Sequence, residues 1–349
     1  MSSQQSSTVY RIITVLMIIA AVSAGGYAIK HTVSCFLLSF VIAYLLDPVL
    51  VYIERRRIKR VYGIIILYAV LGVLAFFAVF FIVPFIAERW TSLLQNLPAY
   101  LQKMKALIAN KHGQLLSSPA FSDWGWMINS AYNKLDTVSG KLGSGVYLAA
   151  SSIAFNLFNL VLAPILVFFM LYYKQQIIDG VKVWLPVSHK ENIIKIGVEI
   201  NDSIGGYLRG QLIVSVIVAV FSTIALLILD VDYALLNGLF AGAASILPFI
   251  GVILATLPPL FFAYIKFQNV AIILKVIGAF AAIYFLEGYL VKPLVFKESM
   301  NLNPLLTIIV VMAFGEMMGF WGILLAIPIA AALKILSAHW RRGDFSVKE

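Results

Sequence analysis

The sequence predicts an all-α, polytopic membrane protein. Of its 349 residues, 62% are hydrophobic and only 12% are charged, whereas a soluble domain carries about 25% charged residues. The charges cluster between apolar runs of about 20 residues, which is the length of a helix that crosses a bilayer. Because these runs are continuous and do not alternate, they predict helices and not the strands of a closed barrel.

The N-terminal part of the chain is predicted to hold four spans and one long polar segment. The spans are expected at about 12–29, 33–53, 61–86 and 146–173. The first run has a signal peptide as its alternative, but a second run follows almost at once, which favours a retained helix. Five cations within Arg55–Arg60 mark a cytoplasmic loop. By parity, the N-terminus is then inside and residues 87–145 are outside.

The two polar segments are predicted to be helical. Outside the membrane, Trp90, Leu93, Leu94 and Leu97 recur at helical spacing. Prolines at positions 98 and 119 are expected to break this segment. The second segment, 174–209, is expected in the cytoplasm, where its isoleucines form one apolar stripe.

The C-terminal part contains two long apolar stretches that are interrupted midway. A span at about 210–229 is followed by the stretch 233–265, which is interrupted at Pro248–Gly251 and again at Pro258–Pro259. A span at about 270–291 is followed by the stretch 304–336, which is interrupted at Gly315–Gly319 and at Gly322. Proline and glycine are the residues that disrupt a helix. Each stretch is therefore predicted to form a hairpin whose tip lies within the membrane.

The order span–hairpin, span–hairpin predicts an inverted repeat, with one hairpin entering from each side. The fold would then have about eight membrane elements, including two re-entrant hairpins, plus a small helical extracytoplasmic segment. The alternative is that each long stretch forms two short full spans. The predicted organisation is membrane spans in 1–86, an extracytoplasmic segment in 87–145, a span in 146–173, a cytoplasmic segment in 174–209, a transport core in 210–340 and a cytoplasmic tail in 341–349.

Several motifs resemble the autoinducer-2 exporter family of bacterial permeases, and they follow that family's order along nearly the whole chain. They are Ala43–Pro48, Tyr207–Leu212, Ile246–Gly251, Glu287 with Lys292–Pro293, Leu302–Pro304 and Phe320–Pro328. One departure is Tyr172–Lys174, where the family usually has an aspartate shortly after the span. A cytoplasmic contact at that place is therefore uncertain from the sequence.

The resemblance implies a multi-pass transporter of the bacterial inner membrane that forms a homo-oligomer, with a pentamer as one candidate order. It implies export of small polar solutes such as autoinducer-2. We expect this export to be coupled to a proton or sodium gradient and to use an elevator-like movement. Some relatives resemble sodium/proton antiporters, so that activity is the first alternative. A channel is the second alternative, because re-entrant hairpins also line pores.

Two intramembrane carboxylates are the candidates for ion coupling. Placing an ionisable group at membrane depth costs about 3 kcal/mol or more of free energy, so such a group is expected to have a function. Glu287 lies in the span at 270–291, and its alternative role is an ion pair with Lys292. Those two residues are five positions apart, which makes pairing on an α-helix imperfect. Glu316 lies in the second interruption, where the alternative role is a helix cap.

Polar groups and helix interruptions are the candidates for solute binding. Arg209 could clamp a hydroxylated or anionic solute or could anchor a helix at the interface. The full set of candidates is Arg209, Gln211, Asn237, Pro248, Gly251, Asn303, Pro304, Gly315 and Gly319. Structural roles are expected for Asp47, Pro48, Lys292, Pro293 and Pro328. Close helix packing is the alternative explanation for the glycines.

Other classes of protein are disfavoured. No phosphate-binding loop of a primary pump and no zinc-protease or nucleophile-elbow motif occurs. The four histidines lack metal-ligand spacing, so neither a metal nor a cofactor is expected. The net charge of +10 orients helices in the membrane and does not indicate nucleic-acid binding. The expected partners are membrane lipid, a small solute or ion, and further copies of the chain.

Overall fold

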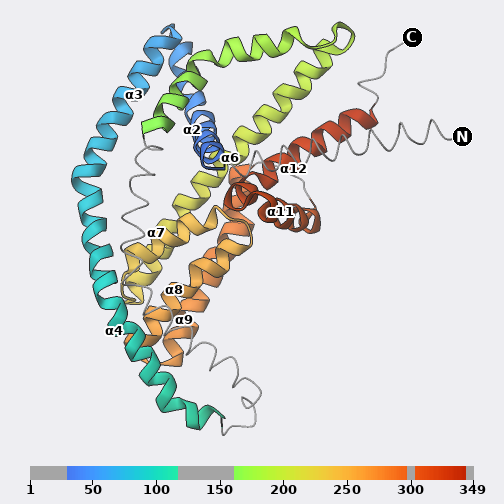
Figure 1. The fold of residues 1–349 in the computed structure, drawn as a ribbon. Coiled ribbons are helices and arrows are strands. Elements are labelled where there is room, and N and C mark those ends of the chain that lie inside the picture. Colours follow the sequence, from blue (N-terminus) through green and yellow to red (C-terminus); the bar gives the residue numbers. More distant parts are fainter. Residues whose placement is uncertain (1–29, 117–160, 297–302, 343–349) are drawn as a thin grey trace, which may run out of the picture. The chain divides into compact units, whose positions relative to one another are not determined.

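The computed structural model describes residues 30–116, 161–296 and 303–342, and each regular element in these ranges is a helix (Figure 1). Seven helices in this part of the chain are long and apolar enough to cross a bilayer, and two shorter apolar helices accompany them. The prediction of an all-α, multi-pass protein is thereby confirmed. The predicted first span at 12–29 lies outside the described residues, as does the interruption at position 119.

The chain divides into two compact units. The first unit comprises Met1–Ile64 and Phe155–Ile177, and the second comprises Ile65–Ala154 and Ile178–Glu349. The second unit contains both interrupted stretches, and it therefore holds most of the residues that the sequence singles out.

The first unit is built on helix α2, Lys30–Arg55, and on the helix Val161–Val183 as far as Ile177. Small side chains let the two helices approach closely. The hydroxyl of Ser39 on α2 lies only 3.4 Å from the carbonyl oxygen of Ala163 on the other helix. The same hydroxyl donates to the carbonyl of Cys35 at 2.7 Å. The buried residues recur every four positions: Cys35, Ser39 and Ala43 on α2, and Ala163, Val167 and Leu171 on its neighbour.

A long helical path follows the basic loop. It consists of α3, Arg60–Phe77, a π-helical turn η1, Ala78–Ile82, and α4, Val83–Leu116. The prediction that Pro98 breaks the polar segment is wrong, because Pro98 lies inside α4. Proline removes one amide donor but keeps φ in the helical range, so a long helix can continue past it. Within the second unit, α4 packs against α7 and α8.

Helix α6, Lys190–Ile228, forms the centre of the second unit. Its 39 residues make it about 58 Å long, well beyond the roughly 30 Å hydrocarbon core. It continues through Gly210 without interruption, so residues 190–209 of the predicted polar segment and the predicted span at 210–229 belong to one helix, whereas residues 174–183 of that segment end the helix Val161–Val183. It packs against α7, α9, α10 and α12.

The first interrupted stretch forms a helical hairpin of α7, Ala234–Ser245, and α8, Ile250–Phe267 (Figure 1). The 12 residues of α7 give a length of about 18 Å, too short to cross the hydrocarbon core. The interruption falls at the predicted Pro248–Gly251. The second predicted interruption is wrong, because Pro258 and Pro259 lie within α8. Neighbouring helices allow proline inside membrane helices in this way.

The second interrupted stretch forms a hairpin of α11, Pro304–Met318, and α12, Phe320–Arg341. These two helices meet at Gly319, which lies within the predicted interruption. The described structure thus has helix–turn–helix hairpins at both predicted places. Their depth in the bilayer and their inverted relation stay predictions.

Between the hairpins lies a helix with a change of pitch. It starts as α9, Val270–Leu286, widens into the π-helical turn η4, Glu287–Val291, and ends as α10, Lys292–Phe296. The widened turn begins at the carboxylate that the sequence singled out for ion coupling.

Candidate ion-coupling site

Glu287 is buried in an apolar part of the second unit. Its residue surface is 5% exposed. Ile283 and Val291, four positions to either side, both belong to the hydrophobic cluster that includes Val214 and Val218 of α6. A carboxylate in such surroundings needs a charge partner or a bound cation.

The charge partner is Lys292. Its ammonium nitrogen Nζ lies 2.9 Å from Oε1 of Glu287. The π-helical turn makes the pairing possible, because the Lys292 amide donates to the Glu287 carbonyl five positions earlier and the turn takes up one extra residue. The sequence argument that this spacing pairs poorly assumed an α-helix, and it is wrong for this turn. The Lys292 side chain is 43% exposed, so the pair joins a buried anion to a half-exposed cation.

Buried hydroxyl groups without a hydrogen-bond partner among the described residues lie on α9, which leads into η4, and on α6. The Tyr284 hydroxyl, on the helical turn before Glu287, has no partner among the described residues. The same holds for Tyr207, Ser203 and Ser222 on α6. Buried hydroxyls normally have a partner, so these groups can accept or donate to water, an ion or a solute hydroxyl. Tyr207 also stacks on Phe296 of α10, with ring centres 5.7 Å apart.

Gln211 stabilises the first hairpin. Its side-chain nitrogen Nε2 donates to the carbonyl of Ser245 at 2.7 Å, and both residues are buried. Ser245 is the last residue of α7, whose final carbonyls lack intrahelical donors. The Ser245 hydroxyl in turn donates to Gly242 at 2.8 Å. The predicted solute-binding amide of Gln211 is therefore engaged in holding α6 against α7.

The tip of the first hairpin is a strained turn. The amide of Ile250 donates to the carbonyl of Pro248 at 2.7 Å, and the residue between them, Phe249, has φ 62° and ψ −52°. This is a γ-turn of the rare strained type. Gly251 follows, and a Cβ there would collide with the carbonyl oxygen of Ala244. Strained backbone of this kind is found at functional sites.

The tip of the second hairpin depends on glycine for two reasons. Gly319 has φ 59° and ψ −134°, a conformation that is essentially restricted to glycine. A Cβ at Gly322 would collide with the carbonyl of Phe314, and one at Gly315 would lie 2.9 Å from Ile323 Cγ1. Close packing, the alternative explanation for these glycines, therefore accounts for Gly315 and Gly322.

The remaining candidates are not gathered around Glu287 by any described contact. The side chain of Asn303 accepts from the Leu305 amide at 2.9 Å and caps α11, which begins at Pro304. Asn237 donates to the Asp232 carbonyl at 3.1 Å. Arg209 is exposed, and its guanidinium lies over Gly205. Glu316 is exposed as well. Of the two prolines, Pro293 lies in the first turn of α10 and Pro328 is buried in α12.

A cavity of about 600 Å³ lies elsewhere in the second unit. It is lined by α4 and the α6–α7 turn, with Arg89, Tyr100 and Asp232 among its polar residues. From the sequence, no role was assigned to these three residues. The signal was the pair Asp230 and Asp232 between two apolar runs.

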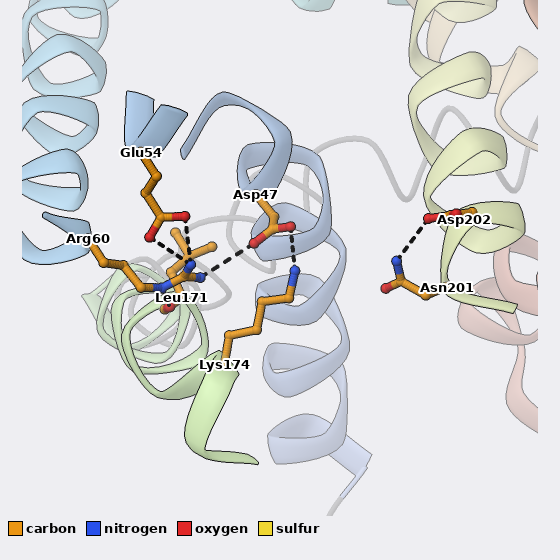
Figure 2. Close-up of polar contacts among 7 residues, drawn as sticks. All are labelled: Asp47, Glu54, Arg60, Leu171, Lys174, Asn201 and Asp202. Atoms are coloured by element: carbon orange, nitrogen blue, oxygen red, sulfur yellow. Dashed lines mark hydrogen bonds and ion pairs between the residues drawn. The ribbon is translucent and has the colours of Figure 1, made fainter. Parts of the chain in front are cut away.

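The first unit holds an ion-pair cluster on α2 and its neighbours (Figure 2). The carboxylate of Asp47 lies 2.6 Å from Lys174 Nζ and 3.5 Å from an Arg60 guanidinium nitrogen. Arg60 also pairs with Glu54 at 3.1 Å and donates to the Leu171 carbonyl at 2.7 Å. Lys174 thus makes a contact where the sequence left one uncertain. Pro48 follows Asp47 inside α2 and does not end that helix.

The described residues contain no group of three His, Cys, Asp or Glu side chains that could hold a metal ion.

Comparison with known proteins shows a matching family and several relatives. Residues 12–342 match the model of a family described as AI-2E family transporter. The chain is 26% identical over 310 residues to "Putative transport protein YrrI" of Bacillus subtilis, covering 88% of this chain and 86% of that protein.

Two relatives from Escherichia coli cover still more of the chain. "Putative permease PerM" is 27% identical over 338 residues, which are 96% of this chain and 94% of the relative. "AI-2 transport protein TqsA" is 25% identical over 332 residues, which are 93% of this chain and 91% of the relative.

Proposed function

Because the chain belongs to the AI-2E family of transporters, we propose that it is a secondary transporter that exports small polar solutes across the bacterial inner membrane. Its energy comes from a proton or sodium gradient, and Glu287 is the residue that binds the coupling cation. The observation that carries the proposal is a carboxylate 5% exposed among apolar side chains and paired with a half-exposed lysine.

The charge balance at Glu287 suggests how coupling works. With Lys292 at 2.9 Å the carboxylate is neutralised from within the helix. A proton or Na⁺ that binds Glu287 takes over this role and releases Lys292 toward solvent. Because an unpaired buried charge is costly, only the two neutral arrangements are well populated. Exchange between them links cation binding to a change at η4.

The π-helical turn gives this exchange a structural consequence. Such single turns contain one extra residue and occur mostly at functional sites. Lys292 is the residue that directly follows η4 and caps its C-terminal end. Loss of the ion pair removes one constraint that favours the widened turn over an α-helix, and relaxation of that turn would rotate α10. Since α10 packs against α6, the rotation would be transmitted to the centre of the unit.

The two hairpin tips are the proposed solute contacts. Interrupted helices in corresponding places of two halves are typical of transporter binding sites, and their interruptions leave backbone groups free for a polar ligand. A relative is named as an AI-2 transport protein, which makes a hydroxylated solute such as autoinducer-2 the first to test. An elevator-like movement and assembly as a homo-oligomer, with five copies as one candidate order, are parts of the same proposal.

A sodium/proton antiporter is the second candidate, because a carboxylate that exchanges H⁺ and Na⁺ needs no organic solute. Purified protein in liposomes separates these functions. The proposed exporter gives saturable uptake of autoinducer-2 that responds to an imposed ion gradient. Ion exchange without any solute flux would favour the antiporter, and flux that neither saturates nor responds to the gradient would favour a channel.

A further inference from the structure

The cavity beside the α6–α7 turn combines apolar walls with the guanidinium of Arg89. Its walls include Phe85 of α4 and Leu227 of α6, whose residue surfaces are 50% and 63% exposed. Arg89 lies one helical turn after Phe85 and lines the same cavity. The occupant must therefore offer both an apolar body and a group that binds a guanidinium.

Most polar groups of the cavity are already engaged with each other. The Tyr100 hydroxyl donates to Asp232 at 2.7 Å, and Lys266 Nζ lies 3.1 Å from the other carboxylate oxygen. The Tyr233 hydroxyl accepts from Asn96 at 3.1 Å and donates to the Ser92 carbonyl at 3.2 Å. These bonds fix α4 against the turn and neutralise the carboxylate.

Arg89 differs from these groups. Its guanidinium carbon lies 5.6 Å from the centre of the Phe85 ring, and no anionic partner for it occurs among the described residues. Glu88 is adjacent in sequence, but neighbouring residues on a helix do not face each other, and Glu88 does not line the cavity. The guanidinium is thus held against a ring and available for an anion.

The position of Arg89 in the chain indicates a membrane–water interface. It follows the apolar run that ends near Ile86, and Trp90 comes directly after it with 53% of its surface exposed. Tryptophan and arginine are typical of the level of the lipid headgroups. The walls of Phe85 and Leu227 then lie where acyl chains are.

We propose that this cavity binds one anionic phospholipid, with its phosphate on Arg89 and an acyl chain along Phe85 and Leu227. Guanidinium and phosphate form two parallel hydrogen bonds, which gives this cation its preference for phosphate. A lipid fits better than a water-soluble anion, because the walls are apolar and the cavity opens at the expected interface. The bound lipid would stabilise the packing of α4 against the α6–α7 turn.

The test is native mass spectrometry of the full chain, purified in detergent and supplied with phosphatidylglycerol or phosphatidylcholine. The wild-type protein should retain phosphatidylglycerol in preference to phosphatidylcholine. Arg89→Gln should lower this retention about tenfold, the loss of one charged hydrogen-bonding partner. Arg89→Lys should retain an intermediate amount, because it keeps the charge without the fork. Lys103→Gln, which removes a cation from the same helix outside the cavity, should match the wild type.

Equal retention by Arg89→Gln and the wild type would overturn the proposal, as would equal losses in the Arg89 and Lys103 variants. A parallel measurement supplies decanoate, a soluble amphiphilic anion, in place of the lipid. If Arg89→Gln keeps phosphatidylglycerol but no longer binds decanoate, the cavity serves a soluble amphiphile and the lipid proposal fails. None of these readouts depends on transport, so they leave the proposed function untouched.

Discussion

Lys292 Nζ lies 2.9 Å from Glu287 Oε1 although five positions separate the two residues. On a regular α-helix that spacing would place them about 140° apart around the axis. The π-helical turn Glu287–Val291 brings them to the same side. The ion pair and the widened turn therefore depend on each other.

The first prediction concerns the stability that this pair contributes. Lys292→Gln leaves the Glu287 carboxylate buried without its cation and should lower the free energy of unfolding by about 1–3 kcal/mol, between the values for exposed and buried pairs. Thermal unfolding of the purified protein in detergent measures the change. The double variant Glu287→Gln with Lys292→Gln should recover part of the loss, because the unpaired charge is gone. Lys275→Gln, an exposed site on α9, serves as control, and an equal loss there would contradict the account.

The second prediction concerns the glycines inside the hairpins. Gly251→Ala and Gly322→Ala each place a methyl group against a backbone carbonyl, so each should destabilise the protein by about 1–3 kcal/mol. Gly278→Ala is the matched control, since nothing lies within 4 Å of a Cβ there, and it should be neutral or stabilising by up to about 1 kcal/mol. The same thermal measurement applies. Similar stability of all three variants would mean that the hairpins are not closely packed.

The third prediction concerns the strained tip. Phe249 has φ 62° at the centre of the γ-turn, and glycine adopts such values without strain. Phe249→Gly should therefore cost less than loss of a half-exposed phenylalanine elsewhere, while making the tip more mobile. Phe285→Gly, on a helix and exposed to a similar degree, provides the comparison and should cost about 1 kcal/mol more for backbone reasons alone. Equal costs at the two sites would indicate that the turn at Phe249 carries no strain.

The fourth prediction concerns the ion-pair cluster of the first unit. Asp47→Asn removes the carboxylate that Lys174 and Arg60 share, and both cations then lose a partner. Because all three side chains are partly exposed, the expected loss is about 1 kcal/mol, at the upper end for such pairs. Asp179→Asn is the control, since Asp179 pairs with Lys182 on the surface and is 56% exposed. High salt should reduce the difference between the two variants.

The interrupted helices could be predicted because glycine and proline act through the local backbone. Both hairpin tips fall where Pro248–Gly251 and Gly315–Gly319 predict them. The same rule failed at Pro98 and at Pro258–Pro259, which lie inside helices. The difference is in the glycines: Gly251 and Gly319 have a tertiary contact or a backbone conformation that only glycine allows, and a proline alone does not stop a helix.

The geometry of the candidate site was less predictable. Composition and position pointed to Glu287, but the pairing with Lys292 depends on a π-helical turn, and one extra residue in a turn leaves no clear pattern in the sequence. The cavity was missed because Arg89 and Asp232 are far apart in the chain and line the same cavity only when α4 packs on the second unit's helices. Gln211 was predicted to bind solute because the sequence does not reveal its hydrogen bond to the Ser245 carbonyl. That bond forms only when two helices pack together.

The fifth and most direct test is transport by Glu287→Gln, which keeps the shape of the side chain and removes its charge. We predict that autoinducer-2 uptake driven by an ion gradient in liposomes is lost in this variant, while exchange of solute at equal ion concentrations on both sides continues. Lys292→Gln should instead bind the coupling cation more tightly, because its competitor is gone. Gradient-driven uptake by Glu287→Gln at the wild-type rate would contradict the assignment of coupling to Glu287 and would make Glu316 the next residue to test.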